Sequence, residues 1–116
     1  MLGDIARAEK TRIGKAGRKA EKKTLDKMGA TPTPNSGAAG SKGDGEWSGY
    51  LLELKSTVKK SMILKLDHLS KITGEAHAAG VEPVLVVVFT DGSGTPLREG
   101  TWVCIPQATF EELTDE

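Results

Sequence analysis

Apolar residues in the first third of the chain recur at steps of three and four, the spacing that gives a helix one apolar side. The positions of this pattern are Ile13, Ala16 and Ala20, followed by Glu21, Leu25 and Met28. Gly29 follows as a C-cap, so the pattern predicts a helix over residues 14–28, with an earlier start near Asp4 left open. Residues 30–49 are rich in Gly, Pro, Ser and Asn and predict a loop or a loose hairpin.

Beyond residue 50 the hydrophobic pattern becomes that of a sheet protein. Residues 50–55 predict a strand, residues 84–89 form a continuous apolar run typical of a strand covered on both faces, and residues 101–105 predict a further strand. Between the first two strands an apolar stripe predicts a helix over residues 61–79, closed by Gly80. The members of this stripe are Met62, Leu66, Leu69, Ile72, Ala76 and Ala79.

The order of these elements predicts an α/β fold. A strand, a helix and a second strand in succession imply a crossover connection, and therefore a mixed sheet flanked by helices. A turn at residues 91–96 and a short helix at residues 110–113 complete the pattern. With 116 residues and 12.3 kDa, the chain suffices for a single small domain with one modest core.

Composition argues against several classes of protein. The lone cysteine, Cys104, excludes an internal disulfide framework and a zinc site built from cysteines, suits a reducing cytoplasm, and is expected in the core. The longest apolar run is far shorter than the roughly 20 residues that span a bilayer, and the N-terminus shows no signal-peptide core. We therefore expect a cytoplasmic protein with no membrane partner. His68 and His77 do not share a helix face and are expected on the surface or in packing.

The zero net charge hides an asymmetry. Residues 1–30 carry nine basic and four acidic side chains, a net charge of +5, and the remaining residues carry the compensating −5. Such a split predicts a cationic helix that meets a polyanion, joined to a body with its own acidic cluster. The alternative interpretation is a solvated helix face. The residues expected to contact phosphates on this helix are Lys15, Arg18, Lys19 and Lys22.

Asp44, Glu53 and Lys55 form the strongest chemical pattern. In a strand, Glu53 and Lys55 project to one face, while Leu52 and Leu54 turn to the opposite, packed face. If Asp44 faces Glu53, the two carboxylates can bind a hard divalent cation such as Mg²⁺, which would polarise a phosphodiester and lower the pKa of a bound water. Lys55 would then stabilise the charge that develops on the phosphate. The alternative is a half-exposed strand with an ordinary Glu/Lys pair.

On these residues the sequence resembles the PD-(D/E)xK nuclease superfamily, and within it the small phage and archaeal Holliday junction resolvases. The resemblance runs from about residue 17 to residue 89, with Gly43 where the superfamily pattern has proline. The matching motifs are Arg18-Lys19-Ala20-Glu21, Asn35-Ser36-Gly37, Lys42-Gly43-Asp44, Glu53-Leu54-Lys55-Ser56-Thr57, LSKITGEA at 69–76 and PVLVVVF at 83–89.

The resemblance implies a restriction-endonuclease-like mixed sheet flanked by helices, with a basic N-terminal segment at residues 1–16 and the nuclease domain at residues 17–116. It implies that Glu21, Asp44 and Glu53 bind Mg²⁺, with Mn²⁺ as a substitute, and that Lys55 is the catalytic lysine. Glu9 is an alternative to Glu21 as the acidic residue of the first helix. The further DNA contacts that we assign are Ser36, Lys42, Ser56, Thr57 and Lys71.

The first functional hypothesis is a homodimeric, metal-dependent endonuclease that resolves four-way junctions in a phage or prokaryotic host cytoplasm. A two-fold dimer would match the two equivalent strands of a junction. The same chemistry would also serve a nuclease for flapped, nicked or linear DNA. The alternative from another class is a non-catalytic nucleic-acid-binding module, in which the basic helix contacts phosphates and the acidic cluster is incidental.

Overall fold

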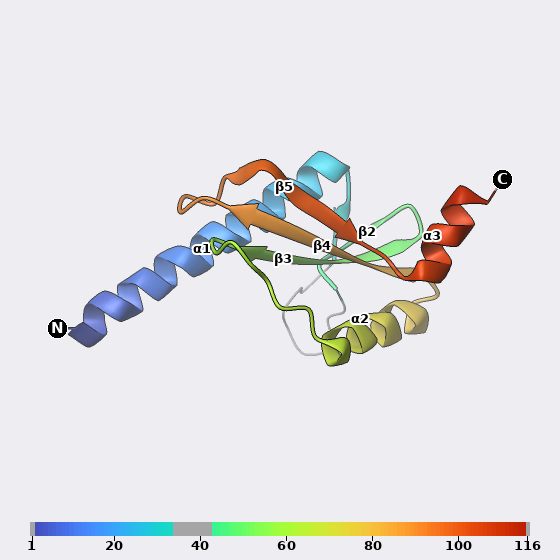
Figure 1. Ribbon diagram of the computed structural model, residues 1–116, viewed down its shortest axis with the longest axis horizontal. Coiled ribbons are helices and arrows are strands. Elements are labelled where there is room, and N and C mark those ends of the chain that lie inside the picture. The colour runs from blue at the N-terminus through green and yellow to red at the C-terminus, as the bar shows by residue number, and fades with distance from the viewer. Residues whose placement is uncertain (1, 34–42, 116) are drawn as a thin grey trace.

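The structure, a computed structural model, describes the backbone of residues 2–14 and all of residues 15–33 and 43–115. It is a small single-domain α/β fold with a five-stranded mixed sheet, as predicted (Figure 1). The strands lie in the order β1-β2-β3-β4-β5; β3 and β4 are parallel and the other pairs antiparallel. The elements are α1 (Leu2–Met28), β1 (Thr31–Pro32), β2 (Gly45–Trp47), β3 (Tyr50–Thr57), α2 (Leu66–Ala78), β4 (Glu82–Thr90), β5 (Pro96–Cys104) and α3 (Gln107–Thr114).

The core lies in two layers, one on each face of the sheet. On one face, Ala20 and Leu25 of α1 pack against alternate residues of the two parallel strands. On the other face, Ile72 of α2 packs against the intervening residues Leu85 and Val87 of β4, and Cys104 is partly buried beside them. Strand β4 is therefore covered on both faces, which explains the continuous apolar run that the sequence shows there.

Residues 30–49, predicted as a loop or a loose hairpin, contain two short strands, β1 and β2, which pair antiparallel, so the hairpin alternative is confirmed. Strands β2 and β3 form a hairpin whose two turn residues, Ser48 and Gly49, have φ angles of 50° and 85°. Positive φ at both central positions is the geometry that suits the twist of a two-residue hairpin. Trp47 and Tyr50 flank this turn with their rings stacked 6.3 Å apart.

Helix α2 begins at Leu66, five residues later than its apolar stripe predicts. The chain leaves β3 at Thr57 and has to cross from the sheet to the helical layer, and extended residues cover more than twice the distance per residue of helical ones. The stripe is correct at Ile72 and Ala76, which are buried, whereas Leu66 and Ala79 are exposed. The residues between the two elements, 58–65, form an irregular segment that we term the β3–α2 connection.

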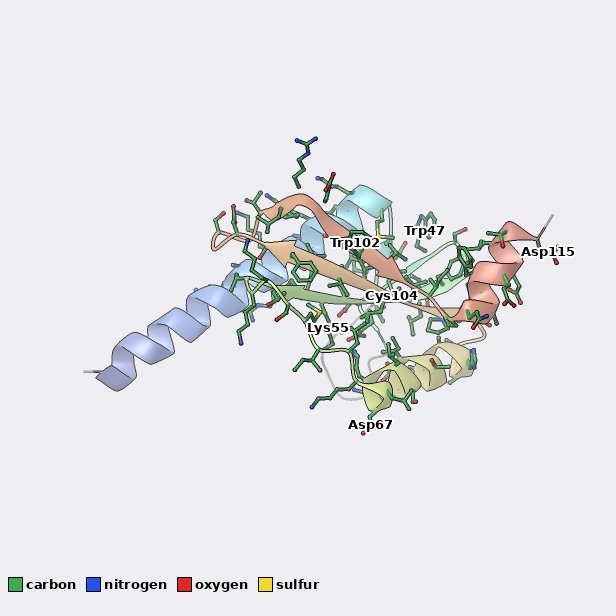
Figure 2. The ribbon with its side chains drawn as sticks, viewed as in Figure 1. Trp47, Lys55, Asp67, Trp102, Cys104 and Asp115 are labelled. Carbon is green, nitrogen blue, oxygen red and sulfur yellow. The ribbon has the colours of Figure 1, made fainter. Side chains whose placement is uncertain are left out.

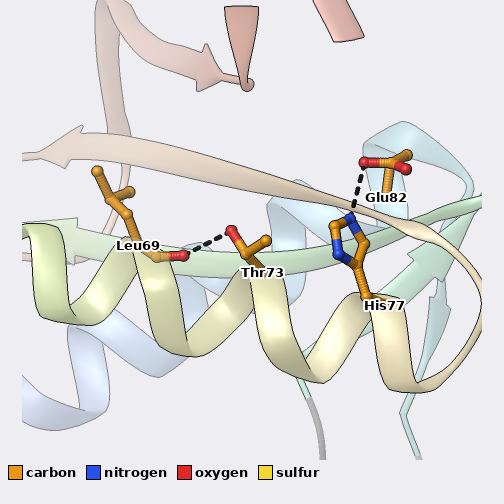
Figure 3. A network of polar contacts seen from close by, with 4 residues as sticks. All are labelled: Leu69, Thr73, His77 and Glu82. Atoms are coloured by element: carbon orange, nitrogen blue, oxygen red, sulfur yellow. Dashed lines mark hydrogen bonds and ion pairs between the residues drawn. The ribbon is translucent and has the colours of Figure 1, made fainter. Parts of the chain in front are cut away.

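Helix α1 starts at Leu2, so it takes the early start that the sequence left open and runs without a break past residue 16. Its N-terminal part extends beyond the sheet (Figure 1). At the other end of the fold, a contact of 3.2 Å between His77 Nε2 and Glu82 Oε2 joins the end of α2 to the start of β4 (Figure 3). No helix in the described parts of the chain is both long and apolar enough to cross a membrane.

Candidate functional site

The candidate site lies where strand β3 loses its antiparallel partner. Strand β2 begins at Gly45, which lies opposite Leu52, so only the first residues of β3 have β2 beside them. Just before it, Asp44 donates its backbone N–H to the Leu52 carbonyl at 2.8 Å, and its Oδ2 accepts the Leu54 N–H at 2.7 Å. The Asp44 carboxylate therefore accepts a hydrogen bond from the edge of β3, where the backbone carbonyl of a further β2 residue would otherwise accept it.

Gly43 gives the chain the turn that precedes Asp44. Its φ is +68°, and a Cβ at this position would lie 2.7 Å from Leu51 Cγ. A proline ring holds φ near −65°, so the backbone here excludes the proline of the superfamily pattern. The chain therefore turns into Asp44 through a left-handed conformation that glycine adopts readily.

The alternation predicted for β3 is confirmed. Leu52 and Leu54 lie in the core layer beneath α1, whereas Glu53 and Lys55 pair with Leu85 and Val87, which belong to the layer beneath α2. Figure 2 marks Lys55 among the side chains drawn on the ribbon. Glu53 and Lys55 therefore share the α2 face of the sheet.

Glu21 approaches the strand from the opposite face. The Ser56 hydroxyl donates a hydrogen bond of 2.9 Å to Glu21 Oε2, and Ser56 shares the α1 face with Leu54. Gly17 permits this close contact, since a Cβ on it would lie 2.9 Å from Ser56 Oγ. Asp44 thus lies at the open edge of β3, with Glu53 on the α2 face of the sheet and Glu21 on the α1 face.

The charges of the site are coupled. Burial, together with the negative charges of Asp44 and Glu75, raises the pKa of Glu53 to about 7 against the opposing effect of Lys55 and Lys71. Burial also raises the pKa of Glu21; the hydrogen bond from Ser56 lowers it, and the charge of Asp44 raises it. The carboxylates therefore repel one another in a partly buried site, a situation that a bound cation would relieve.

The donor chemistry of the site fits a hard divalent cation, because carboxylate oxygens are the ligands that Mg²⁺ takes. The residues that would hold it are Asp44 and Glu53, with Glu21 beside them. Among residues 15–33 and 43–115, however, no three acidic, histidine or cysteine side chains are grouped closely enough to form a ready metal-binding cluster. In this arrangement one carboxylate oxygen of Glu21 accepts a hydrogen bond from the Ser56 hydroxyl instead.

The structure distributes the predicted DNA-binding residues over several places. The Lys71 ammonium lies 3.9 Å from the Glu75 carboxylate and lowers the pKa of Glu53, so Lys71 faces the site.

The basic residues of α1 lie elsewhere. Lys15 and Lys19 border a hollow of about 400 Å³ together with Gly92 and Ser93 of the turn between β4 and β5. Arg18 and Lys22 are exposed on α1. Thr57 follows Ser56 at the end of β3. Ser36, Lys42 and the alternative Glu9 have no described side chains.

Two residues near the site escaped the sequence interpretation. Glu75 lies one helical turn beyond Lys71 on α2, and this spacing of four residues could have indicated from the sequence that the two side chains are neighbours. His68 has a buried Nε2 for which the described atoms offer no hydrogen-bond partner. Burial and the charges of Lys55 and Lys71 lower the pKa of His68, whereas Glu75 opposes this shift. The lowered pKa favours the neutral imidazole of His68, which lies on α2, on the same face of the sheet as Glu53 and Lys55.

A groove of about 490 Å³ opens beside the site at the C-terminal end of β3. Glu21, Lys55 and Ser56 line it together with residues of the β3–α2 connection. The arrangement offers a cation-compatible acidic group and a lysine next to an open groove, a combination suited to a phosphodiester substrate. No protein-family model, curated protein or solved structure matches the chain.

Proposed function

We propose that the protein is a metal-dependent, structure-selective DNA endonuclease of the PD-(D/E)xK type, with Holliday junction resolution as its first assigned activity. The observation that carries this proposal is the assembly of Asp44, Glu53 and Lys55 at the open edge of β3. Hydrogen bonding holds Asp44 at that edge, and the strand alternation keeps Glu53 and Lys55 on one face. The mixed sheet between α1 and α2 is compatible with a restriction-endonuclease-like fold.

The residues have distinct roles in this proposal. Asp44 and Glu53 hold Mg²⁺, or Mn²⁺ in its place, with Glu21 as the third carboxylate. The ion, when bound, polarises the phosphodiester and lowers the pKa of water. Lys55 orients the attacking water and stabilises the negative charge that develops on the phosphate. Lys71 balances the charge of Glu53 and Glu75 from α2.

The DNA partner follows from charge and exposure. Lys15, Arg18, Lys19 and Lys22 lie on α1, the helix that also supplies Glu21, so one element would bind phosphates and complete the site. Such contacts recognise the shape of the backbone rather than its bases. We propose a homodimer acting in the cytoplasm, because two opposed cuts in a four-way junction require paired sites.

A cleavage assay tests the proposed function. End-labelled four-way junction, flap, nicked and linear substrates are incubated with the protein in Mg²⁺, in Mn²⁺ and in EDTA. We expect cleavage in either metal, none in EDTA, and the fastest cleavage for the junction. If a flap, a nicked duplex or linear DNA is cut fastest, the proposed nuclease activity stands and the proposed junction resolution is wrong.

A non-catalytic nucleic-acid-binding module is the second candidate function. The observation that favours it is that Glu21, Asp44 and Glu53 do not form a ready metal-binding cluster among the described residues. This candidate predicts salt-dependent DNA binding through α1 with no strand cut in Mg²⁺ or Mn²⁺. The acidic charge at β3 opposes phosphate binding unless a cation neutralises it, which favours the nuclease.

A further inference from the structure

The groove beside the candidate site has two kinds of wall. One wall belongs to the site and includes Glu21 and Lys55. The other is formed by the β3–α2 connection, which contributes Lys59, Ser61, Met62 and Ile63. A strand of DNA whose phosphate lies at Lys55 would therefore pass along the connection as it leaves the site.

The polar groups of the connection suit a phosphate. Residues 58–65 contain three lysines and no acidic residue, and of these lysines Lys59 lines the groove. Thr57 Oγ1 accepts the backbone N–H of Lys59 at 3.1 Å, so its own hydroxyl proton stays available to a phosphate oxygen. Ser61, exposed in the same groove, adds a second hydroxyl. Ser56 differs from both, since its proton is donated to Glu21.

The apolar residues of the β3–α2 connection would contact a part of the substrate other than its phosphates. Ile63 is 81% exposed although it lines the groove next to Lys59 and Ser61. The outside of a DNA duplex offers phosphates and sugars, whereas the apolar faces of the bases are hidden in the stack. Apart from contacts to thymine methyl groups in the major groove, apolar side chains such as isoleucine meet bases where the stack is opened. A phosphate groove with an exposed isoleucine on its wall therefore matches a strand that carries an unstacked base.

We propose that the β3–α2 connection binds the strand next to the cut and makes the enzyme selective for DNA with an unstacked base at that position. Lys59, with the hydroxyls of Thr57 and Ser61, holds the neighbouring phosphate, and Ile63 packs against the exposed base. The inference rests on the proposed nuclease function and names the feature of the substrate that this site recognises. A branch point, where base stacking is interrupted, supplies such a base; an intact linear duplex does not.

The lysine is tested by the salt dependence of binding. Affinity for a four-way junction and for a linear duplex is measured by fluorescence anisotropy at several salt concentrations, with Ca²⁺ in place of Mg²⁺. Lys59→Ala should weaken binding to both DNAs and reduce the slope of log affinity against log salt by about 0.7 to 0.9. Lys60→Ala is the matched control, because Lys60 is exposed but does not line the groove. Lys59→Arg should restore the slope.

The isoleucine is tested by the preference among substrates. Ile63→Ser should reduce the preference for the junction over the linear duplex by about tenfold, the scale of one lost apolar contact, and leave affinity for the linear duplex unchanged. Binding of the wild type should change the fluorescence of a 2-aminopurine placed at the branch point, and Ile63→Ser should abolish this change. Leu66→Ser is the matched control, since Leu66 is 76% exposed and lies outside the groove lining. Melting temperatures of all five variants should equal that of the wild type, because the side chains are exposed.

The outcomes separate this inference from the proposed function. If the wild type cuts DNA in Mg²⁺ but Lys59→Ala and Ile63→Ser behave like their controls, the inference is wrong and the nuclease stands. If binding depends on Lys59 and Ile63 but no strand is cut, the nuclease is wrong and the strand-binding surface stands. Binding to phosphatidylserine vesicles that both variants abolish, with DNA affinity unchanged, would assign the connection to a lipid surface and overturn the inference.

Discussion

The two halves of strand β3 differ in what lies beside them. Residues 50–52 are paired with β2 on one side and β4 on the other, and Leu51 and Leu52 are buried. Residues 53–57 keep β4 as their partner but lose β2, and the carboxylate of Asp44 receives the N–H of Leu54 instead. The first half contributes to the core, and the second half carries every β3 residue that we assign to the site.

The difference shows how a small fold makes room for charge. A strand edge left without a strand still needs acceptors for its N–H groups, and a carboxylate can serve as one. Held there, Asp44 lies close enough to Glu21 and Glu53 to raise the pKa of both. The end of the β2 pairing at Leu52 thus leaves room for a partly buried acidic site beside the second half of the strand.

The largest expected effect concerns Asp44. Asp44→Asn keeps an oxygen that can accept the Leu54 N–H but removes the negative charge, so it separates edge capping from metal binding. We expect cleavage to fall by about 1,000-fold or more, with the melting temperature kept and DNA binding unchanged or tighter. Glu46→Gln, an exposed residue on β2, serves as the control and should cut normally. A near wild-type rate for Asp44→Asn at saturating Mg²⁺ would show that the site is misassigned.

Lys55 should follow in size. Lys55→Ala should lower the single-turnover cleavage rate by about 100- to 1,000-fold, because in the proposed nuclease the ammonium stabilises charge that develops in the transition state. The Mg²⁺ concentration at half-maximal rate should stay the same, since Lys55 is not a metal ligand. Rates across a Mg²⁺ titration measure both quantities. Ordinary cleavage together with a lower melting temperature would make Lys55 a structural residue only.

The pH dependence of stability tests the buried charge at Glu53. The pKa of Glu53 is raised to about 7 in the folded protein, so its stabilising contribution is full below about pH 4.5 and is lost as pH rises through 7. Without divalent cations, Glu53→Gln should therefore be more stable than the wild type at pH 8 by about 1 kcal/mol, after allowance for solvent screening. Urea denaturation at pH 5 and pH 8 measures this difference.

Two further measurements sharpen this result. Mg²⁺ at pH 8 should stabilise the wild type and leave Glu53→Gln almost unchanged, since the variant lacks the ligand charge. Glu112→Gln, exposed on α3, should follow the wild type at every pH. Without metal, a stability advantage of Glu53→Gln over the wild type that does not grow from pH 5 to pH 8 would contradict the raised pKa.

The smallest effect concerns the contact between α1 and β3. Gly17→Ala would place its Cβ 2.9 Å from Ser56 Oγ and should gain no stability, although alanine in a helix interior usually stabilises by about 0.5–1 kcal/mol. Ser56→Ala should cost about 1 kcal/mol by removing the hydrogen bond to Glu21. In that background Gly17→Ala should regain the usual helical benefit. Thermal unfolding of the four proteins gives the coupling energy.

Gly74→Ala is the matched control for this cycle. Gly74 lies inside α2 with no atom within 4 Å of the Cβ it would acquire. The substitution should stabilise the protein by about 0.5–1 kcal/mol whether residue 56 is serine or alanine. Equal gains from Gly17→Ala in both backgrounds would mean that Gly17 does not control the approach of α1 to Ser56.

The sequence by itself determined the elements that depend on local periodicity. The apolar run of β4, the alternation that separates Leu54 from Glu53 and Lys55, and the buried positions Ile72 and Ala76 of α2 were all predictable. Each depends on the period of two or 3.6 residues that a strand or helix imposes. The same reasoning could not choose between a loop and a loose hairpin for residues 30–49, because two- and three-residue strands have no period to detect. It also missed the late start of α2, because connections follow the distance between layers.

Only the tertiary structure decided how the candidate site is assembled. The hydrogen bond between Ser56 and Glu21 joins residues 35 positions apart, and the one between Leu54 and Asp44 joins residues ten apart. The spacing of Asp44 and Glu53 did not indicate that one caps a strand edge while the other points toward α2. The groove lined by Lys59 and Ile63 was equally invisible, because the stripe at residues 61–79 predicted a helix there. Local patterns set which face a side chain occupies, whereas contacts between distant segments depend on how the chain packs.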